Sequence, residues 1–272
     1  MAVDKFAASD GIGLAYYIDD YTDPWRKADT LLLLHAAVGS ARRFYGWVPA
    51  LCRHYRVVRL DLRGHGASDV PPASSPLNLD RLVADVSELL EHLGVEAAHI
   101  VGNSAGGYLA QNLAMTSPQK VKSLMLFGST PGLRNSQAAS WLPRIATEGL
   151  RNFFASTIAD RLPLDKVPAG LPGWFVDEAA KNDPAWITRF IGLMSTLDWS
   201  DRLAEIKCPT LIVMPGGETV GSIKNYDVMI ERIPDVQAIT YEHMPHNICD
   251  AAPDRCAADV LAFLRWRFGL PA

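Results

Sequence analysis

The segment that most constrains the fold is residues 98–116, where an apolar run, a glycine-rich turn and an amphipathic run follow one another without a break. Residues 98–101 have the composition of a buried strand, and residues 108–115 place apolar side chains at three- and four-residue spacing, as a helix does. Between them, small residues flank Ser104. Such neighbours let a strand and a helix approach closely while the central residue takes a strained backbone conformation. Ser104 is therefore predicted to project from a tight strand-to-helix turn.

This Gly-x-Ser-x-Gly pattern is typical of a nucleophile elbow. A lone match also describes a glycine-rich surface turn, but the flanking strand and helix favour the elbow. A serine hydroxyl is a weak nucleophile until a base takes its proton, so a histidine is expected nearby. His246 is the predicted base, because it lies in a loop between the last predicted strand and the last predicted helix. His243 competes on composition, and the His-x-x-His spacing leaves a metal site as the weaker alternative.

The acid that orients such a histidine is expected between residues 104 and 246, because nucleophile, acid and base then follow on successive loops at one edge of the sheet. The loop 215–220 offers one carboxylate, Glu218. Glu218 would accept the second ring N–H of His246 and so fix its tautomer. The alternative is a solvated loop glutamate.

Two backbone N–H groups are needed to stabilise the oxyanion that forms during acyl transfer. One is predicted at Ala105, directly after the nucleophile. The other is predicted at Ala37, in the turn 35–40 that follows the first long apolar run. His35 is expected to fix this turn by hydrogen bonding.

Short apolar runs alternate with helical stretches along most of the chain. The predicted strands are 3–8, 14–18, 30–35, 56–60, 98–103, 121–127, 208–214 and 236–241, and the predicted helices are 41–53, 78–93, 104–117, 222–232 and 253–268. This alternation predicts an α/β fold, with a mostly parallel eight-stranded sheet and helices on both faces. It stops in residues 131–198, which have helical spacing and many aromatic residues. We predict a core domain formed by 1–130 and 199–272, and a helical cap formed by 131–198.

Together these motifs resemble the α/β-hydrolase superfamily over nearly the whole chain. The resemblance rests on the turn 35–40, the Asp-Leu-Arg-Gly-His-Gly-Ala-Ser-Asp segment at 61–69, the elbow, the Cys-Pro-Thr entry at 208–210 and His246 before a terminal helix. It implies the α/β-hydrolase fold, with Ser104 as nucleophile, His246 as base and 131–198 as the cap over the active site.

Two departures from the family pattern concern the oxyanion turn and the acid. Ala36 stands where similar hydrolases usually have glycine, and the acid loop is shortened and carries Glu218 where they usually have aspartate. The other position at which some relatives carry the acid reads Gly-Ser-Thr, at 128–130. Since that position has no carboxylate, Glu218 is favoured.

The resemblance implies a serine hydrolase that cleaves a small carboxylic ester or a lactone through an acyl-enzyme on Ser104. Likeness to enol-lactone hydrolases, homoserine-lactone hydrolases and small carboxylesterases supports this hypothesis. The elbow Gly-Asn-Ser-x-Gly-Gly is also similar to that of the meta-cleavage-product hydrolases, so hydrolysis of a carbon-carbon bond is the alternative. A third hypothesis, from another class, is a non-catalytic relative that binds a small ligand.

Five side chains are candidates for substrate binding, and each has a structural alternative. The arginines could pair with a substrate carboxylate in bidentate fashion or be solvated at the surface. The tryptophans could line a pocket or pack the cap onto the core. The candidates are Arg42, Arg43, Arg134, Trp141 and Trp174.

Composition excludes several other classes. A formal net charge of -4, with 49% hydrophobic and 21% charged residues, describes an ordinary globular protein with no basic surface for nucleic acid. No apolar run reaches the ~18 residues of a membrane helix and no signal peptide is evident, so a cytoplasmic location without a membrane partner is expected. The four cysteines lack Cys-x-x-Cys spacing, so no disulfide frame or zinc site is expected. The Gly-Ile-Gly at 11–13 lacks the third glycine and the following helix of a dinucleotide fingerprint, and no metal or cofactor is expected. The expected partner is a small-molecule substrate. The sequence is compatible with a homodimer but does not determine the oligomeric state.

Overall fold

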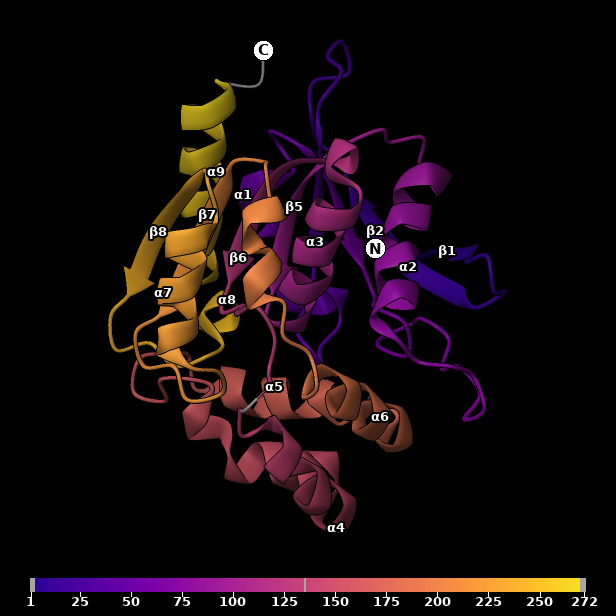
Figure 1. Cartoon of the computed structure of the whole chain (residues 1–272), viewed down its shortest axis with the longest axis vertical. Helices are drawn as coiled ribbons and strands as arrows, with labels where there is room; N and C mark the ends of the chain where they lie inside the picture. Colours follow the sequence, from indigo (N-terminus) through magenta and orange to yellow (C-terminus); the bar gives the residue numbers. More distant parts are fainter. Residues whose placement is uncertain (1–2, 135, 270–272) are drawn as a thin grey trace.

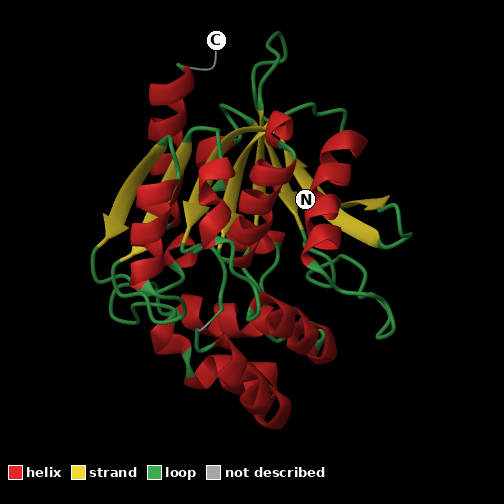
Figure 2. Ribbon diagram, viewed as in Figure 1, coloured by secondary structure: helices red, strands yellow, loops and turns green. Residues whose placement is uncertain are grey.

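The computed structural model describes residues 3–134 and 136–269. An eight-stranded sheet runs through the centre of the molecule, and helices cover both of its faces (Figures 1 and 2). The strands are β1 Asp4–Ala7, β2 Gly13–Asp19, β3 Thr30–Leu34, β4 Arg56–Leu60, β5 Ala98–Asn103, β6 Val121–Phe127, β7 Thr210–Pro215 and β8 Val236–Tyr241. The predicted fold class, a mostly parallel sheet of eight strands between helices, is confirmed.

The strand order is β1-β2-β4-β3-β5-β6-β7-β8. β1 pairs with β2, and β2 with β4, in antiparallel fashion, whereas every pairing from β4 to β8 is parallel. Every residue of β3 is buried, as expected for a parallel strand covered on both faces. Because parallel strands end at the same edge, the loops after β3, β5, β7 and β8 lie together at the carboxyl edge of the sheet.

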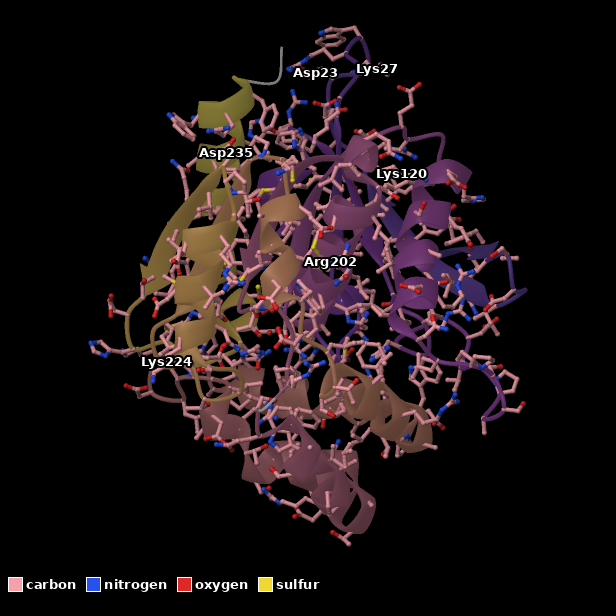
Figure 3. All side chains as sticks on the ribbon, in the orientation of Figure 1. Asp23, Lys27, Lys120, Arg202, Lys224 and Asp235 are labelled. Atoms are coloured by element: carbon pink, nitrogen blue, oxygen red, sulfur yellow. The ribbon has the colours of Figure 1, made fainter. Side chains whose placement is uncertain are left out.

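Two apolar layers hold the helices against the sheet. Buried side chains of α2 (Leu79–His92), α3 (Ala105–Thr116) and α7 (Ile223–Arg232) belong to one cluster. Those of α1 (Val48–Leu51), α8 (Ile248–Ala251) and α9 (Pro253–Phe268) belong to a second cluster. Charged side chains such as Lys27 and Lys224 project from the surface (Figure 3). The core on both faces of the sheet is therefore apolar.

The prediction of one helix over 41–53 is wrong. The segment forms a 3-10 helix over Ala41–Phe44 and the short helix α1, with a turn between them. Gly46 occupies that turn against α9, where a Cβ would lie 2.9 Å from Pro253. The Trp47 indole then donates to the carbonyl of Cys249 over 3.0 Å. Packing against the C-terminal helices overrides the local helical pattern.

Between β6 and β7, the described residues form no strand of the sheet; the segment carries α4 (Ala138–Ser156), α5 (Gly170–Ala179) and α6 (Pro184–Met194). These helices form a separate layer below the carboxyl edge of the sheet (Figure 1). An isolated bridge between Gly132 and Asp198 brings the two ends of the segment together. The layer therefore faces the loops that carry the predicted site residues.

Candidate active site

The strand-to-helix turn at Ser104 depends on close packing of glycines. Ser104 has a φ of 50° and a ψ of -116°, which is a strained conformation for a residue with a side chain. A Cβ on Gly106 would lie 2.2 Å from the carbonyl oxygen of Leu34, and one on Gly102 would lie 2.3 Å from the Cα of Gly107. The Ser104 amide donates to the carbonyl of Phe127 over 2.9 Å. These contacts hold the serine at the carboxyl end of β5.

Three predicted residues come together in one hydrogen-bonded chain. Nε2 of His246 lies 3.1 Å from Oγ of Ser104. Nδ1 of the same ring lies 2.8 and 2.9 Å from the two carboxylate oxygens of Glu218. His246 is 6% exposed, and the Glu218 side chain is fully buried. Because Glu218 accepts a hydrogen bond from Nδ1–H, the ring is held in the tautomer whose Nε2 is free to accept from the serine hydroxyl.

Glu218 is held by more than the histidine. Its Oε1 accepts hydrogen bonds from the backbone amides of Val220 (2.8 Å) and Gly221 (3.1 Å), and Tyr226 donates to Oε2 over 3.2 Å. Burial acts to raise the pKa of this carboxyl, but His246 and the two amides outweigh burial and lower the pKa from 4.5 to about 2. Glu218 is therefore a carboxylate near neutral pH.

This lowered pKa gives a testable dependence of stability on pH. Because the unfolded chain holds the ordinary pKa, it binds more protons than the folded chain between about pH 5 and pH 2, so the free energy of unfolding falls as pH falls through that window. We expect Glu218→Gln to lose this component, so that its unfolding free energy changes less between those pH values than that of the wild type. Glu242→Gln, an exposed position nearby, is the matched control and should follow the wild type. Parallel curves for all three proteins in denaturant titrations would contradict the assignment.

The turn after β3 provides the second predicted oxyanion donor. Burial lowers the pKa of His35 from 6.5 to about 4, although its bond to Ala36 acts to raise the pKa, so the ring is neutral near pH 7. Its Nε2 accepts from the amide of Leu62 over 3.0 Å, and Nδ1–H then donates to the carbonyl of Ala36 over 2.7 Å. Within the described residues the Ala37 amide donates no hydrogen bond, and Ala105 is the first residue of α3, where an amide has no partner inside the helix. Both residues line the cavity at Ser104.

A cavity of about 50 Å³ lies at Ser104 and His246, enclosed between the core and the helical segment. Its walls are mostly apolar. The core contributes Ala36, Val38 and Tyr108, and the helical segment contributes Leu133, Trp141, Phe154, Arg161, Phe175, Ile191 and Met194. Of the tryptophans considered for substrate binding, Trp141 lies in this cavity. Trp174 packs edge-on against Tyr45, with ring centroids 5.3 Å apart, and lines a separate outer groove.

The three arginines considered for substrate binding lie elsewhere. Arg42 lines the outer groove and pairs with Glu178 over 3.1 Å. Arg43 is buried, and Asp250 binds its Nε and Nη2 in bidentate fashion. Arg134 is exposed and donates to a backbone carbonyl. None of the three lines the cavity at Ser104.

Arg161 is the cavity residue that sequence reasoning missed. It lies in the helical segment, follows a 3-10 helix over Ile158–Asp160 and is 5% exposed. The segment contains several arginines, and nothing in their sequence context separates Arg161 from exposed ones such as Arg144 and Arg151. Only the packing of the segment onto the core identifies it.

Along the described ranges 3–134 and 136–269, no helix combines the length and the apolar character needed to cross a membrane.

Comparison with known proteins identifies the family. A model of the alpha/beta hydrolase fold matches residues 29–253. The crystal structure of a hydrolase from Pseudomonas aeruginosa PA01 is 30% identical, covers 96% of this chain and 98% of its own, and superimposes with a TM-score of 0.86.

Two curated relatives are named for different substrates. A 2-hydroxy-6-oxononadienedioate/2-hydroxy-6-oxononatrienedioate hydrolase from Pseudomonas putida is 28% identical over 71% of this chain and 72% of its own. A pimeloyl-[acyl-carrier protein] methyl ester esterase from Aeromonas hydrophila is 27% identical over 79% of this chain and 87% of its own. With the family model spanning most of its length, the chain belongs to the alpha/beta hydrolase fold family.

Proposed function

We propose that the protein hydrolyses a small carboxylic ester or a lactone through an acyl-enzyme on Ser104. The observation that carries this proposal is the hydrogen-bonded chain from Glu218 through His246 to the hydroxyl of Ser104, at one end of an apolar cavity. Membership of a hydrolase family supports it, as does the likeness to a methyl ester esterase.

In the proposed reaction, Ser104 Oγ attacks the substrate carbonyl carbon while His246 Nε2 takes the hydroxyl proton. The amides of Ala37 and Ala105 donate to the oxyanion of the tetrahedral intermediate. The intermediate collapses as His246 gives its proton to the leaving alkoxide, and the alcohol departs. Water then attacks the acyl-enzyme with His246 as base, which releases the acid and restores the serine. Glu218 keeps the imidazole in the required tautomer and stabilises its cationic form.

We assign the helical segment 131–198 as the cap of this site. Its residues form one wall of the cavity over Ser104, so the segment would exclude bulk water from the reaction.

Hydrolysis of a carbon-carbon bond is the second candidate function. Its support is the likeness to the 2-hydroxy-6-oxononadienedioate hydrolase and the Gly-Asn-Ser elbow at 102–104. The same serine and histidine would serve either bond, because both reactions transfer an acyl group to water. Substrate preference, and not the triad, separates the two.

A substrate panel measured against Ser104→Ala tests the proposal. The panel contains p-nitrophenyl esters of short acids, a series of lactones and a vinylogous diketone of the meta-cleavage type. We expect turnover that requires Ser104, with kcat/KM for the best ester or lactone at least ~10-fold above that for the diketone, equivalent to ~1.4 kcal/mol in the barrier. A better diketone would favour the carbon-carbon alternative, and a panel without turnover that requires Ser104 would favour a ligand-binding protein.

A further inference from the structure

Arg161 places a positive charge in the cavity without an acidic partner. Its Nη1 donates to the carbonyl (3.0 Å) and the hydroxyl (2.8 Å) of Thr157. Among the residues that the structure describes, no carboxylate forms an ion pair with Arg161. The neighbouring Asp160 is exposed. The guanidinium is therefore buried beside the serine without a counter-charge.

The other buried arginine in this region shows how the fold neutralises such a group. Arg43 donates from Nε and Nη2 to the two carboxylate oxygens of Asp250, and its guanidinium lies 3.8 Å from the centre of the Phe175 ring. A buried charge without a partner is costly, because it loses hydration and gains no attraction in return. Arg161 is such a buried charge, and the described chain gives it no ion-pair partner. This indicates that its partner comes from outside the chain.

The free edge of the Arg161 guanidinium has the shape of a carboxylate receptor. With Nη1 bound to Thr157, Nε and Nη2 form no hydrogen bond to any described residue. Two adjacent N–H groups on one edge of a planar guanidinium match the two oxygens of a carboxylate. The rings of Phe154 and Trp141 flank the group, with centroids 4.6 and 5.5 Å from the guanidinium carbon. These rings restrict its movement and its access to water.

The backbone couples this arginine to the loops of the triad. The carbonyl of Arg161 accepts from the amide of Asn247, directly after His246, over 3.0 Å. The carbonyl of Asp160 accepts from the hydroxyl of Thr219, directly after Glu218, over 3.1 Å. These two hydrogen bonds fix the backbone at Arg161 relative to the loops that carry His246 and Glu218.

The charge on Arg161 persists near neutral pH. Burial lowers its pKa to about 10; Asp160 acts against burial, and the guanidiniums of Arg43 and Arg144 add to it. A group with that pKa is still protonated at pH 7. The site therefore presents a cation at the pH at which His246 is to act as a base.

We propose that Arg161 binds a carboxylate of the substrate, so that the natural ester or lactone is an anion that carries a free carboxylate in addition to its scissile bond. This inference rests on the proposed function and deepens it. The competing explanation is that Arg161 only packs against the aromatic rings of the cap.

The test compares anionic and neutral substrates of matched shape. One pair differs by a carboxylate on the acyl side: the p-nitrophenyl monoester of glutarate and p-nitrophenyl 5-methylhexanoate. The other carries it on the alcohol side, carboxymethyl butanoate and isobutyl butanoate. The readout is the ratio of kcat/KM for the anionic over the neutral member, which does not depend on the fraction of enzyme that is folded. The proteins are the wild type, Arg161→Met, Arg161→Lys and the matched control Arg151→Met, an exposed arginine of the same segment.

In at least one pair we expect the ratio to fall ~30-fold or more in Arg161→Met, as when one partner of a buried charge pair is lost. Arg161→Lys, which keeps the charge but not the planar edge, should lie between, and Arg151→Met should match the wild type. A ratio unchanged in both pairs would overturn the proposal in favour of packing alone.

Failure of the proposed function is separable from failure of this inference. If no substrate is hydrolysed in a way that requires Ser104, then the proposed hydrolysis is wrong. The carboxylate site is then judged by calorimetric binding of glutarate. Weaker binding to Arg161→Met than to Arg151→Met supports the site, and equal binding refutes it.

Discussion

Replacement of Ser104 with alanine is expected to lower kcat for the best ester or lactone by about 10⁶-fold, the scale on which removal of a triad nucleophile acts. The substitution deletes the atom that would form the acyl-enzyme and leaves His246 with no hydroxyl to deprotonate. The turn should survive, because it is held by the backbone of residue 104. Its amide donates to Phe127, and its carbonyl accepts from the hydroxyl of Ser129 over 2.9 Å. Steady-state kinetics and the melting temperature, measured together, check both parts.

The two histidines of the last loop sharpen this prediction. His246→Ala should cost about as much as Ser104→Ala, because nucleophile and base act as a unit and loss of either disables it. His243, three residues earlier, is exposed and provides a matched control whose alanine variant should keep wild-type kcat. Equal losses for both histidine variants would leave the base unassigned. Activity retained by Ser104→Ala would refute the acyl-enzyme mechanism.

The centre of the sheet was predictable because strands β3 and β5 are buried on both faces. A strand such as Thr30–Leu34, with four consecutive leucines and every residue buried, has few folded environments other than the interior of a parallel sheet. Order along the chain then fixed which loops meet at the carboxyl edge. The helix expected over 41–53 failed for a tertiary reason, since Gly46 packs against Pro253, more than two hundred residues away, and local periodicity carries no information about that contact.

The candidate site likewise has features that the sequence predicts and features that only the folded structure reveals. Ser104 was identifiable because its turn imposes a local pattern of small residues, and Glu218 because the loop after β7 offers one carboxylate. The network that holds Glu218, two amides and the Tyr226 hydroxyl, depends on loop geometry that composition does not encode.

The choice among arginines was the least predictable step. Proximity in sequence to the oxyanion turn favoured Arg42 and Arg43, yet the first faces an outer groove and the second is neutralised by Asp250. Arg161 reaches the cavity only through the fold of the helical segment. An unpaired buried charge can be recognised once burial and partners are known, and a single sequence gives neither.

Glu218→Gln is expected to lower kcat by up to ~10⁴-fold, the scale seen when a triad carboxylate becomes an amide. The amides of Val220 and Gly221 donate to the Oε1 position, so the oxygen of the glutamine must occupy it. The NH₂ group then takes the Oε2 position, 2.8 Å from Nδ1 of His246, where it donates to the ring. This contact favours the tautomer in which Nδ1 accepts and Nε2 carries the proton, and in that tautomer the histidine cannot take the proton of Ser104.

Two further variants separate this tautomer effect from a general disturbance of the loop. Glu218→Asp keeps the charge but withdraws the carboxylate by one methylene, and a displacement of about 1 Å should cost ~10²-fold. Glu242→Gln makes the same chemical change at an exposed position and should leave kcat unaltered. The order of kcat should therefore be wild type and Glu242→Gln, then Glu218→Asp, then Glu218→Gln, with the melting temperature at neutral pH confirming that each protein is folded. Ester hydrolysis by Glu218→Gln at the wild-type rate would show that the orienting acid lies elsewhere.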